Sequence, residues 1–318
     1  MDHAKMRHLH GGKPGVSRDI VFKERHEIAD GTWLVVFEKP ETFQYRAGQH
    51  VRMHLKGHHR FWSFASSPFQ PDLAFAIRLR DTPAKRALMR LPVGAKVRID
   101  MMPDPPPGAF VLDDTEMRTI VFLCGGIGVV PAVSMIRRTL RQGSGGRFVL
   151  LYACQRPSAA PFLDELTTLA AEHGNFTFVP SMTRLDDNAV WSGERGRIDR
   201  AMMDRHVPGL ADADVYVAGL RSMVQDMREL LRDAGIPATA IRTEDFGDFA
   251  FRRRSRILPP ILTVVAVLLA VALHAVPVAL WLRTGTSRPA MIAAGLVAVV
   301  VAIKCLWLLR RPRHTAKA

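Results

Sequence analysis

Cysteine is scarce in this sequence, and its scarcity excludes several kinds of site. The 318 residues include 3 cysteines, Cys124, Cys154 and Cys305, and no CxxC pair. A disulfide framework, an iron–sulfur cluster and a zinc site are therefore not expected, and we predict no bound metal. The opening segment MDHAKMRHLHGG lacks an apolar core. We therefore expect no signal peptide and interpret residues 1–15 as a flexible arm.

Acidic residues are absent after Asp248, and this explains the basic character of the chain. The formal net charge is +14, and the 11 Lys and Arg residues that follow Asp248 account for all but +3 of it. The positive charge thus belongs to the C-terminal tail. Because the preceding residues are nearly balanced, we predict no nucleic-acid partner.

The same tail contains two long apolar stretches that predict a transmembrane hairpin. Residues 257–282 include no Asp, Glu, Lys or Arg, and residues 289–309 include only Lys304. Each stretch reaches the roughly 20 residues that a helix needs to cross a bilayer. Basic residues fill the linker 251–256 and the tail 310–318, so the positive-inside rule predicts that the N-terminal body and the C-terminus are cytoplasmic.

This hairpin would attach the chain to lipid at the inner or plasma membrane. A buried hairpin of a soluble protein is the alternative. His274 is the only titratable side chain in the first stretch. One histidine cannot bind a haem iron from both sides, so we interpret the hairpin as a tether and give His274 a packing role.

Short strand-like runs dominate residues 16–114. The runs are TWLVVFE, HVRMHL, FWSFA, LAFAIRL and KVRIDM, and turns rich in Gly, Pro and Asp separate them. One helix-like run, TPAKRALMRL, interrupts the series. Strands at such regular spacing predict a small antiparallel β-barrel.

Residues 115–250 alternate between strand-like and helix-like runs, which predicts a parallel α/β sheet. Ligands bind such sheets at the carboxyl ends of the strands. GGIGVVP, CQR, SMTR and GLRSM each follow a strand-like run there. We therefore expect these four turns to lie at one edge of the sheet and to form a binding site.

The segment RTIVFLCGGIGVVPAVSMIRRTL, residues 118–140, carries the clearest motif. A strand, a turn on Gly125, Gly126 and Gly128, and a helix that contains Pro131 would present backbone N–H groups to an anion such as a pyrophosphate. The motif GGxGxxP is neither the dinucleotide fingerprint GxGxxG nor a P-loop. A tight turn into a packed helix is the alternative.

The helix after this turn is predicted to be amphipathic. Its apolar face would carry Val133, Ile136 and Leu140, and its polar face Arg137, Arg138 and Arg141. We expect the apolar face to pack on the sheet.

A second constellation is HRFWSFASSP. Arg60 offers a fork for phosphate, Trp62 offers a plane for stacking, and the Ser63 hydroxyl can donate to a ring nitrogen. An ordinary amphipathic strand is the alternative for this segment alone.

Together, these motifs resemble the ferredoxin–NADP reductase superfamily over roughly residues 18–246. Arg60 to Ser63 is similar to the superfamily's flavin motif RxY(S/T), and Gly125 to Pro131 is similar to its nucleotide motif GGxGxxP. YACQRPSAAPFLDEL, SMTR, WSGERGRI, VYVAGLRSM and TEDF resemble further segments in the same order.

The resemblance implies FAD as a bound cofactor and NAD(P)H as the hydride donor. It implies catalytic roles for Ser63, near the flavin N5, and for Glu244. The residues that it implies for binding the flavin are Arg60, Trp62, Ser63, Arg78, Lys85, Arg86 and Phe246. Those that it implies for the nicotinamide nucleotide are Gly125, Gly126, Gly128, Pro131, Arg156, Thr183, Arg184, Arg195, Arg197, Gly219 and Met223.

The cations at Arg184, Arg195 and Arg197, with the hydroxyl of Thr183, favour NADPH over NADH, because they suit a 2′-phosphate. Solvated loop arginines are the alternative, and NADH stays possible.

Five positions depart from the superfamily's pattern. Lys85 stands where a Ser or Thr usually binds the pyrophosphate, and Ala218 replaces a frequent cysteine. Leu220 and Arg221 replace both prolines of the following turn. Phe246, the closing aromatic, does not end the chain.

The sequence predicts a membrane-anchored flavoprotein reductase that passes electrons from NAD(P)H through FAD to an unidentified acceptor. A non-catalytic flavin- or nucleotide-binding regulatory subunit is one alternative, which the departures at Ala218 and in the adjacent turn suggest. A free-standing ferric or flavin reductase is the other.

Overall fold

The computed structural model describes residues 16–246 apart from 102–104, 106–107, 113–117, 144 and 187–188. Several expected segments lie outside these residues: the arm 1–15, the domain boundary between 114 and 115, the basic segments 251–256 and 310–318, and the apolar stretches 257–282 and 289–309. Across the described part of the chain, no helix is both long and apolar enough to cross a membrane.

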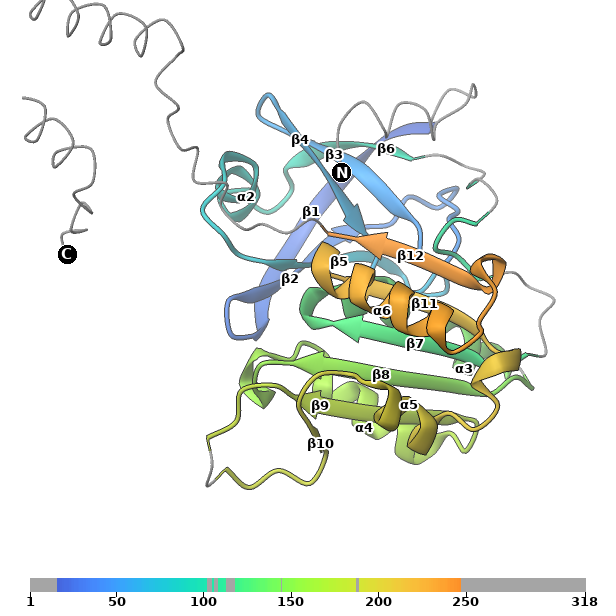
Figure 1. Ribbon diagram of the computed structural model, residues 1–318. Helices are drawn as coiled ribbons and strands as arrows, with labels where there is room; N and C mark the ends of the chain where they lie inside the picture. Colours follow the sequence, from blue (N-terminus) through green and yellow to red (C-terminus); the bar gives the residue numbers. More distant parts are fainter. Residues whose placement is uncertain are drawn as a thin grey trace, which may run out of the picture. The chain divides into compact units, whose positions relative to one another are not determined.

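A six-stranded antiparallel sheet forms the first half of the described chain, in the order β4-β3-β6-β1-β2-β5 (Figure 1). Its strands are β1 (Val16–Ala29), β2 (Thr32–Glu38), β3 (His50–Leu55), β4 (His58–Ser63), β5 (Asp72–Arg78) and β6 (Lys96–Met101). Within the described pairings, β4 bonds to β3 and β5 bonds to β2, without a ladder between β4 and β5. The sheet is therefore an open half-barrel rather than the closed barrel that we predicted.

Alternation of side chains builds the core of this half-barrel. On β3, Val51, Met53 and Leu55 are buried, whereas the residues between them are exposed or half-buried. Because successive side chains of a strand point to opposite faces, this period of two gives one apolar face. The helix α2 (Pro83–Met89) closes the core with Ala84, Ala87 and Leu88.

The strand β1 was not predicted from the sequence. Charged residues interrupt its alternation, and its pairing with β2 shifts register between Phe22 and Glu24 and again between Glu27 and Ala29. Such irregularities bend a strand, which lets β1 pair with β6 over its first half and with β2 over its second half.

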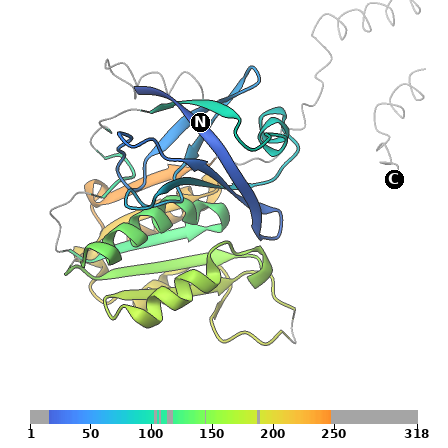
Figure 2. The same ribbon diagram turned by 180° about the vertical axis from the view of Figure 1, so that it is seen from behind.

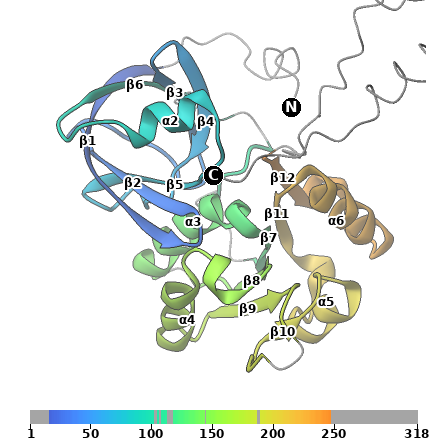
Figure 3. The same cartoon turned by 90° about the vertical axis from the view of Figure 1, so that its left-hand side faces the viewer.

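The second half of the described chain is a parallel sheet, as predicted, in the order β10-β9-β8-β7-β11-β12. Its strands are β7 (Ile120–Gly125), β8 (Phe148–Cys154), β9 (Phe176–Met182), β10 (Glu194–Arg195), β11 (Asp214–Gly219) and β12 (Ile241–Asp245). Helices α3 (Val129–Gln142) and α4 (Leu163–Glu172) cover one face (Figure 2), and α5 (Arg200–His206) and α6 (Arg221–Asp233) cover the other (Figure 3).

The strand order reverses beside β7. From β7 the chain builds outward to β8, β9 and β10, then returns to place β11 and β12 on the opposite side of β7. The crevice outside the carboxyl ends of strands at such a switch point is where ligands bind open α/β sheets. Here this crevice lies between the turn after β7 and the turn after β11.

Helix α3 joins the two halves through a shared core. Its first eight residues are all buried, against the parallel sheet on one side and against residues of the half-barrel such as Ala65 and Phe110 on the other. Ser134 Oγ donates to the Ser66 carbonyl at 2.5 Å, and Tyr216 Oη donates to the Val111 carbonyl at 3.0 Å. The two halves are therefore held in one arrangement by buried contacts.

The predicted polar face of α3 is only partly correct. Arg137 is 17% exposed, because it donates to the Ala65 carbonyl at 2.8 Å and pairs with Glu165 of α4 at 2.6 Å. Sequence periodicity assigns one buried face to a helix, whereas α3 is covered from two sides.

Candidate active site

The glycine turn after β7 forms the floor of the crevice. Gly126 has a φ of +52°, and a Cβ there would meet nothing within 4 Å, so its backbone is open to a ligand. A Cβ on Gly128 would lie 2.4 Å from the carbonyl oxygen of Ala218 on β11. Gly126 therefore allows the turn and exposes it, whereas Gly128 is needed for close packing of the turn on β11.

Met223 of α6 fills the space between the two strand ends. A Cβ on Gly125 would lie 2.3 Å from Met223 Sδ, and a Cβ on Gly219 would lie 2.9 Å from the same atom. Pro131 lies buried in the first turn of α3, where a missing N–H leaves no intrahelical bond unmade. The structure thus brings these predicted nucleotide ligands together at the switch point.

The two predicted catalytic residues meet across the halves of the molecule. Ser63 ends β4, and Glu244 lies on β12. The Ser63 hydroxyl donates to Glu244 Oε1 at 2.8 Å. Ser63 is 4% exposed and the Glu244 side chain 18%, so this hydrogen bond is largely removed from water. Their catalytic roles stay predictions.

Burial raises the pKa of Glu244 to about 7. The hydrogen bond from Ser63 opposes this shift, and the neighbouring charge of Asp245 adds to it. Glu244 Oε2 is buried and has no hydrogen-bond partner among the described residues. A carboxyl in this state can hold or release a proton near neutral pH, and its second oxygen can accept a bond from a ligand.

Phe246 and the turn after β11 close this end of the crevice. The Phe246 N–H donates to the Gly219 carbonyl at 3.0 Å, and its ring packs on the shared core. Leu220 has φ −64° and ψ 148°, a conformation that proline also adopts. Arg221 pairs with Asp245 at 3.7 Å. The residues that replace the prolines therefore keep a proline-like backbone at Leu220.

A cluster of cations lies at the edge of the half-barrel. Arg60 of β4, Arg78 of β5 and nearby Arg80 act on Lys85 of α2 and, with burial as the largest cause, lower its pKa to about 8. The Lys85 ammonium donates to the Arg78 carbonyl. Positive groups this close suit a ligand with several negative charges.

The neighbours of this cluster have other partners. Arg86 pairs with Asp81, so its charge is balanced within the protein. Thr82 caps α2, because its hydroxyl accepts the Lys85 N–H at 3.4 Å. Trp62 is half-buried against the half-barrel core. Of the predicted flavin ligands here, Lys85, Arg60 and Arg78 lie together, whereas Arg86 is directed to Asp81.

Further arginines follow the strand ends on the far side of the crevice. Arg156 lies after β8, Arg184 after β9 and Arg197 after β10, and all three are exposed. Arg195 donates to the Ala189 carbonyl at 2.9 Å. The Thr183 hydroxyl donates to the Cys154 carbonyl at 3.1 Å, so an anion could receive only its lone pairs or its N–H neighbours. The arginines therefore carry the stronger signal for an anion.

These features fit the two cofactors that the sequence implies. The cations around Lys85 suit the phosphates of FAD, and the open backbone of Gly126 suits the pyrophosphate of a nicotinamide nucleotide. The unpartnered Glu244 Oε2 marks a polar position between them. Residues from both halves would therefore contact the ligands.

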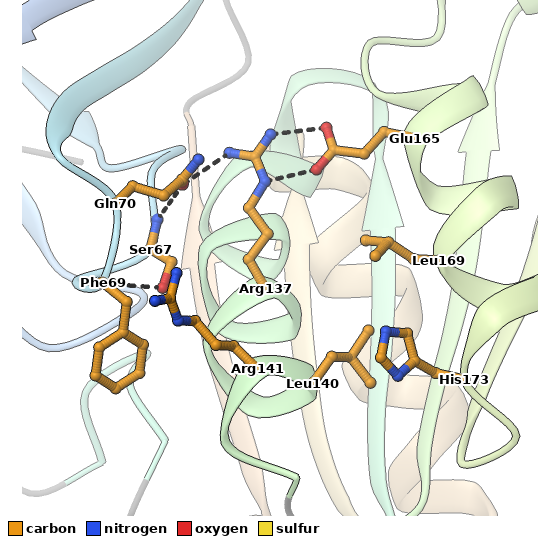
Figure 4. A pocket seen from close by; sticks show the side chains of 9 residues that line it. All are labelled: Ser67, Phe69, Gln70, Arg137, Leu140, Arg141, Glu165, Leu169 and His173. Carbon is orange, nitrogen blue, oxygen red and sulfur yellow. Dashed lines mark hydrogen bonds and ion pairs between the residues drawn. The ribbon is translucent and has the colours of Figure 1, made fainter.

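A separate cavity of about 290 Å³ lies beside α3 (Figure 4). It is lined by Ser67, Phe69, Gln70, Arg137, Leu140, Arg141, Glu165, Leu169 and His173. Its central cation, Arg137, is bonded to Glu165 and to Gln70, as the dashed lines show. Its lining comes from the second half of α3, two turns or more beyond the glycine turn, so we assign it to the junction of the two halves.

Sequence reasoning missed three residues near the site. Arg80 was passed over although it lies two residues from Arg78, and Thr82 precedes Pro83 as a helix cap usually does. His50 Nδ1 lies 4.0 Å from Glu244 Oε1. Its signal was the strand period, which places His50 on the opposite face from the buried Val51.

Comparison with known proteins extends this geometry. Residues 122–229 match the profile of the oxidoreductase NAD-binding domain. The glycine betaine monooxygenase reductase subunit of Pseudomonas aeruginosa is 24% identical over 220 residues, which are 68% of this chain and 60% of that protein. This chain thus spans less than two thirds of that relative's length.

Two solved structures have a similar fold. A cytochrome P450 reductase from Amycolatopsis has a TM-score of 0.63 and 22% identity, over 73% of this chain and 71% of that one. A ferredoxin NADP⁺ reductase from Neisseria gonorrhoeae, with bound FAD and NADP, has a TM-score of 0.60 and 20% identity, over 72% of this chain and 98% of that one.

Proposed function

We propose that this chain, which has the two-domain fold of the ferredoxin–NADP reductases, is a flavoprotein reductase that moves electrons from NAD(P)H through FAD to a redox partner. The observation that carries the proposal is the hydrogen bond between Ser63 and Glu244 at the switch point of the parallel sheet. It joins a hydroxyl of the proposed flavin half to a titratable carboxyl of the proposed nucleotide half, where two reacting cofactors would meet.

The chain's own residues would bind and orient the cofactors. Lys85, Arg60 and Arg78 would hold the phosphates of FAD, and the Gly126 backbone would hold the pyrophosphate of the nucleotide. FAD, when bound, supplies hydride acceptance and release of single electrons. Ser63 would position its hydroxyl near the reacting ring, and Glu244 would hold or take up the proton that Ser63 shares with it.

NADPH is the nucleotide that we favour. Arg184 and Arg197 are exposed at the carboxyl edge of the sheet, beyond the glycine turn. A guanidinium forms strong charge-assisted bonds with a phosphate, which NADPH carries on its ribose and NADH lacks. This supports NADPH without excluding NADH as a slower donor.

The acceptor is proposed to be a one-electron redox protein at a membrane. The apolar stretches 257–282 and 289–309 support a tether, with the reductase body and the C-terminus in the cytoplasm. A tether raises the local concentration of a membrane-bound partner. The relative in Pseudomonas aeruginosa is named as the reductase subunit of a monooxygenase, which supports an oxygenase component as the partner class.

The proposal is tested by anaerobic rapid mixing of the detergent-purified full chain with NADPH and, separately, with NADH. We expect the visible absorption of the bound flavin to bleach with both nucleotides and faster with NADPH. A flavin that stays oxidised with both would instead support the regulatory-subunit alternative. Purified protein without flavin would contradict the assignment of the cation cluster.

A soluble acceptor separates the remaining alternative. Turnover with ferric chelates that is unchanged when the residues after Arg252 are removed would support a free-standing reductase. Turnover that needs a membrane acceptor and the tail would support the tethered reductase.

A further inference from the structure

Reduction of a one-electron acceptor by a hydride donor releases a proton. One NADPH and two oxidised acceptors yield NADP⁺, two reduced acceptors and one H⁺. Under the proposed function, the hydride and its electrons pass through the buried end of the crevice. The proton must therefore leave from a position where Ser63 is 4% exposed.

The structure provides a sequence of three proton-carrying groups from this position to solvent. Ser63 Oγ donates to Glu244 Oε1 at 2.8 Å, and His50 Nδ1 lies 4.0 Å from the same oxygen. Exposure rises along the sequence, from 18% for the Glu244 side chain to 41% for that of His50. The three residues come from β4, β12 and β3.

The position of His50 is fixed by the sheet. His50 is the direct cross-strand partner of Ser63 in the antiparallel pair of β3 and β4. Directly paired residues point to the same face, so the imidazole lies on the side where Ser63 meets Glu244. The ring also packs edge-on against Phe61, with centroids 5.6 Å apart, which limits its rotation.

We infer that His50 is the group that accepts the proton of Glu244 and passes it to solvent, an inference that rests on the proposed function. Ser63 transfers its proton to Glu244 Oε1 as it receives one from the reduced cofactor, and Glu244 then loses that proton to His50 Nδ1. A side-chain rotation or one bridging water closes the 4.0 Å gap between Glu244 and His50.

The charges around Glu244 support such a transfer. Asp245 raises its pKa, and the interaction between Glu244 and the buried Cys124 raises the pKa of that thiol. Arg221 draws on Asp245 at 3.7 Å. With the pKa of Glu244 near 7 and that of an ordinary histidine near 6.5, a proton moves between the two at little cost.

The first test measures Glu244 itself. In the full chain, the infrared carbonyl band of protonated Glu244 is identified by its loss in Glu244→Gln and then followed against pH. A protonated His50 favours the ionised carboxyl, so we expect His50→Gln to raise the pKa of Glu244 by about 0.5 to 1. His54→Gln, two residues along β3 and bonded to Asp100, is the matched control and should leave it unchanged.

The second test uses chemical rescue with ferricyanide as a one-electron acceptor. We expect turnover with NADPH to fall about tenfold in His50→Gln and to recover when imidazole is added to the buffer. His54→Gln should keep full turnover and gain nothing from imidazole. His50→Asn serves as the second variant if His50→Gln does not fold.

The two failures are distinguishable. If NADPH does not reduce the flavin of the unaltered chain, the proposed function fails, and the infrared titration still tests the contact between His50 and Glu244. If the unaltered chain turns over but His50→Gln keeps the same pKa of Glu244, or shows a loss that imidazole does not restore, the role of His50 is wrong.

Discussion

Ser63 and Glu244 are 181 residues apart in the chain, and the Ser63 hydroxyl donates to Glu244 Oε1 at 2.8 Å. One residue ends a strand of the half-barrel, and the other lies on the last described strand of the parallel sheet. The bond therefore forms only when both halves have folded and docked through α3.

The raised pKa of Glu244 predicts a pH-dependent stability. Its pKa is about 7 in the folded chain against an ordinary 4.5, so the folded state binds the proton more tightly. The stabilisation is complete below about pH 4.5 and is lost as pH rises through 7, by at most about 3 kcal/mol. Denaturant unfolding at a series of pH values should show this fall, and Glu244→Gln should flatten it.

Glu194 is the control for that slope. Its bonds with His206 and Arg205 lower its pKa, so its contribution is lost only below about pH 4.5. Glu194→Gln should therefore leave the slope between pH 4.5 and 7 intact. An unchanged slope in Glu244→Gln would contradict the assignment.

The cation cluster predicts a difference between two adjacent residues. Lys85→Met should weaken FAD binding about 10- to 100-fold, because a charge-assisted bond to phosphate contributes about 1.5–3 kcal/mol. Arg86→Met should change it less than about twofold, since Asp81 already balances Arg86. Fluorescence titration of flavin-depleted protein with FAD measures both, and equal losses would place the phosphates elsewhere.

The exposed Arg184 predicts a nucleotide-specific effect. Arg184→Ala should raise the KM for NADPH by about tenfold or more and leave that for NADH nearly unchanged, because only NADPH has a 2′-phosphate to lose a bond. Steady-state kinetics with the two nucleotides contain their own control. A similar rise for both would remove the 2′-phosphate role.

The approach of Gly128 to β11 predicts a steric cost. Gly128→Ala would place a methyl group 2.4 Å from the Ala218 oxygen, and overpacking of this kind costs about 1–3 kcal/mol. Gly174→Ala is the control, since a Cβ there meets nothing within 4 Å and its φ is not positive. Thermal or denaturant unfolding should separate the variants, and equal stability would show that the turn can relax.

The proline-like backbone of Leu220 predicts a neutral or favourable substitution. Leu220→Pro should stabilise the chain by about 0.4–1 kcal/mol, because proline restricts the unfolded chain and φ is already −64°. Leu230→Pro, inside α6, should cost about 3 kcal/mol. Loss of stability in Leu220→Pro would mean that its N–H is needed.

The sequence predicts the regular elements well where one periodicity acts alone. TWLVVFE, HVRMHL, KVRIDM and DVYVAG form β2, β3, β6 and β11 with the expected ends, because local alternation or an apolar run decides each of them. β1 was missed, because its bulges and charges hide a period that pairing with two neighbours imposes. The short α5 was missed as well, since seven residues carry little helical signal.

The candidate site divides in the same way. The glycine turn and the flavin motif could be located from short motifs, each within a single turn or strand. The bond between Ser63 and Glu244 could not, because it depends on how two sheets dock. The same holds for the burial of Arg137, which α3 owes to the half-barrel and to α4 together.

The double coverage of α3 bears on how this chain can be recombined. A helix whose buried surface is divided between two sheets belongs to neither as a module. Exchange of the nucleotide half with that of another reductase would transfer Ser134 and Arg137 but leave their acceptors, the Ser66 and Ala65 carbonyls, in the recipient. A functional chimaera must therefore carry the loop of residues 65–70 along with the helix, so that the exchangeable unit is discontinuous in sequence.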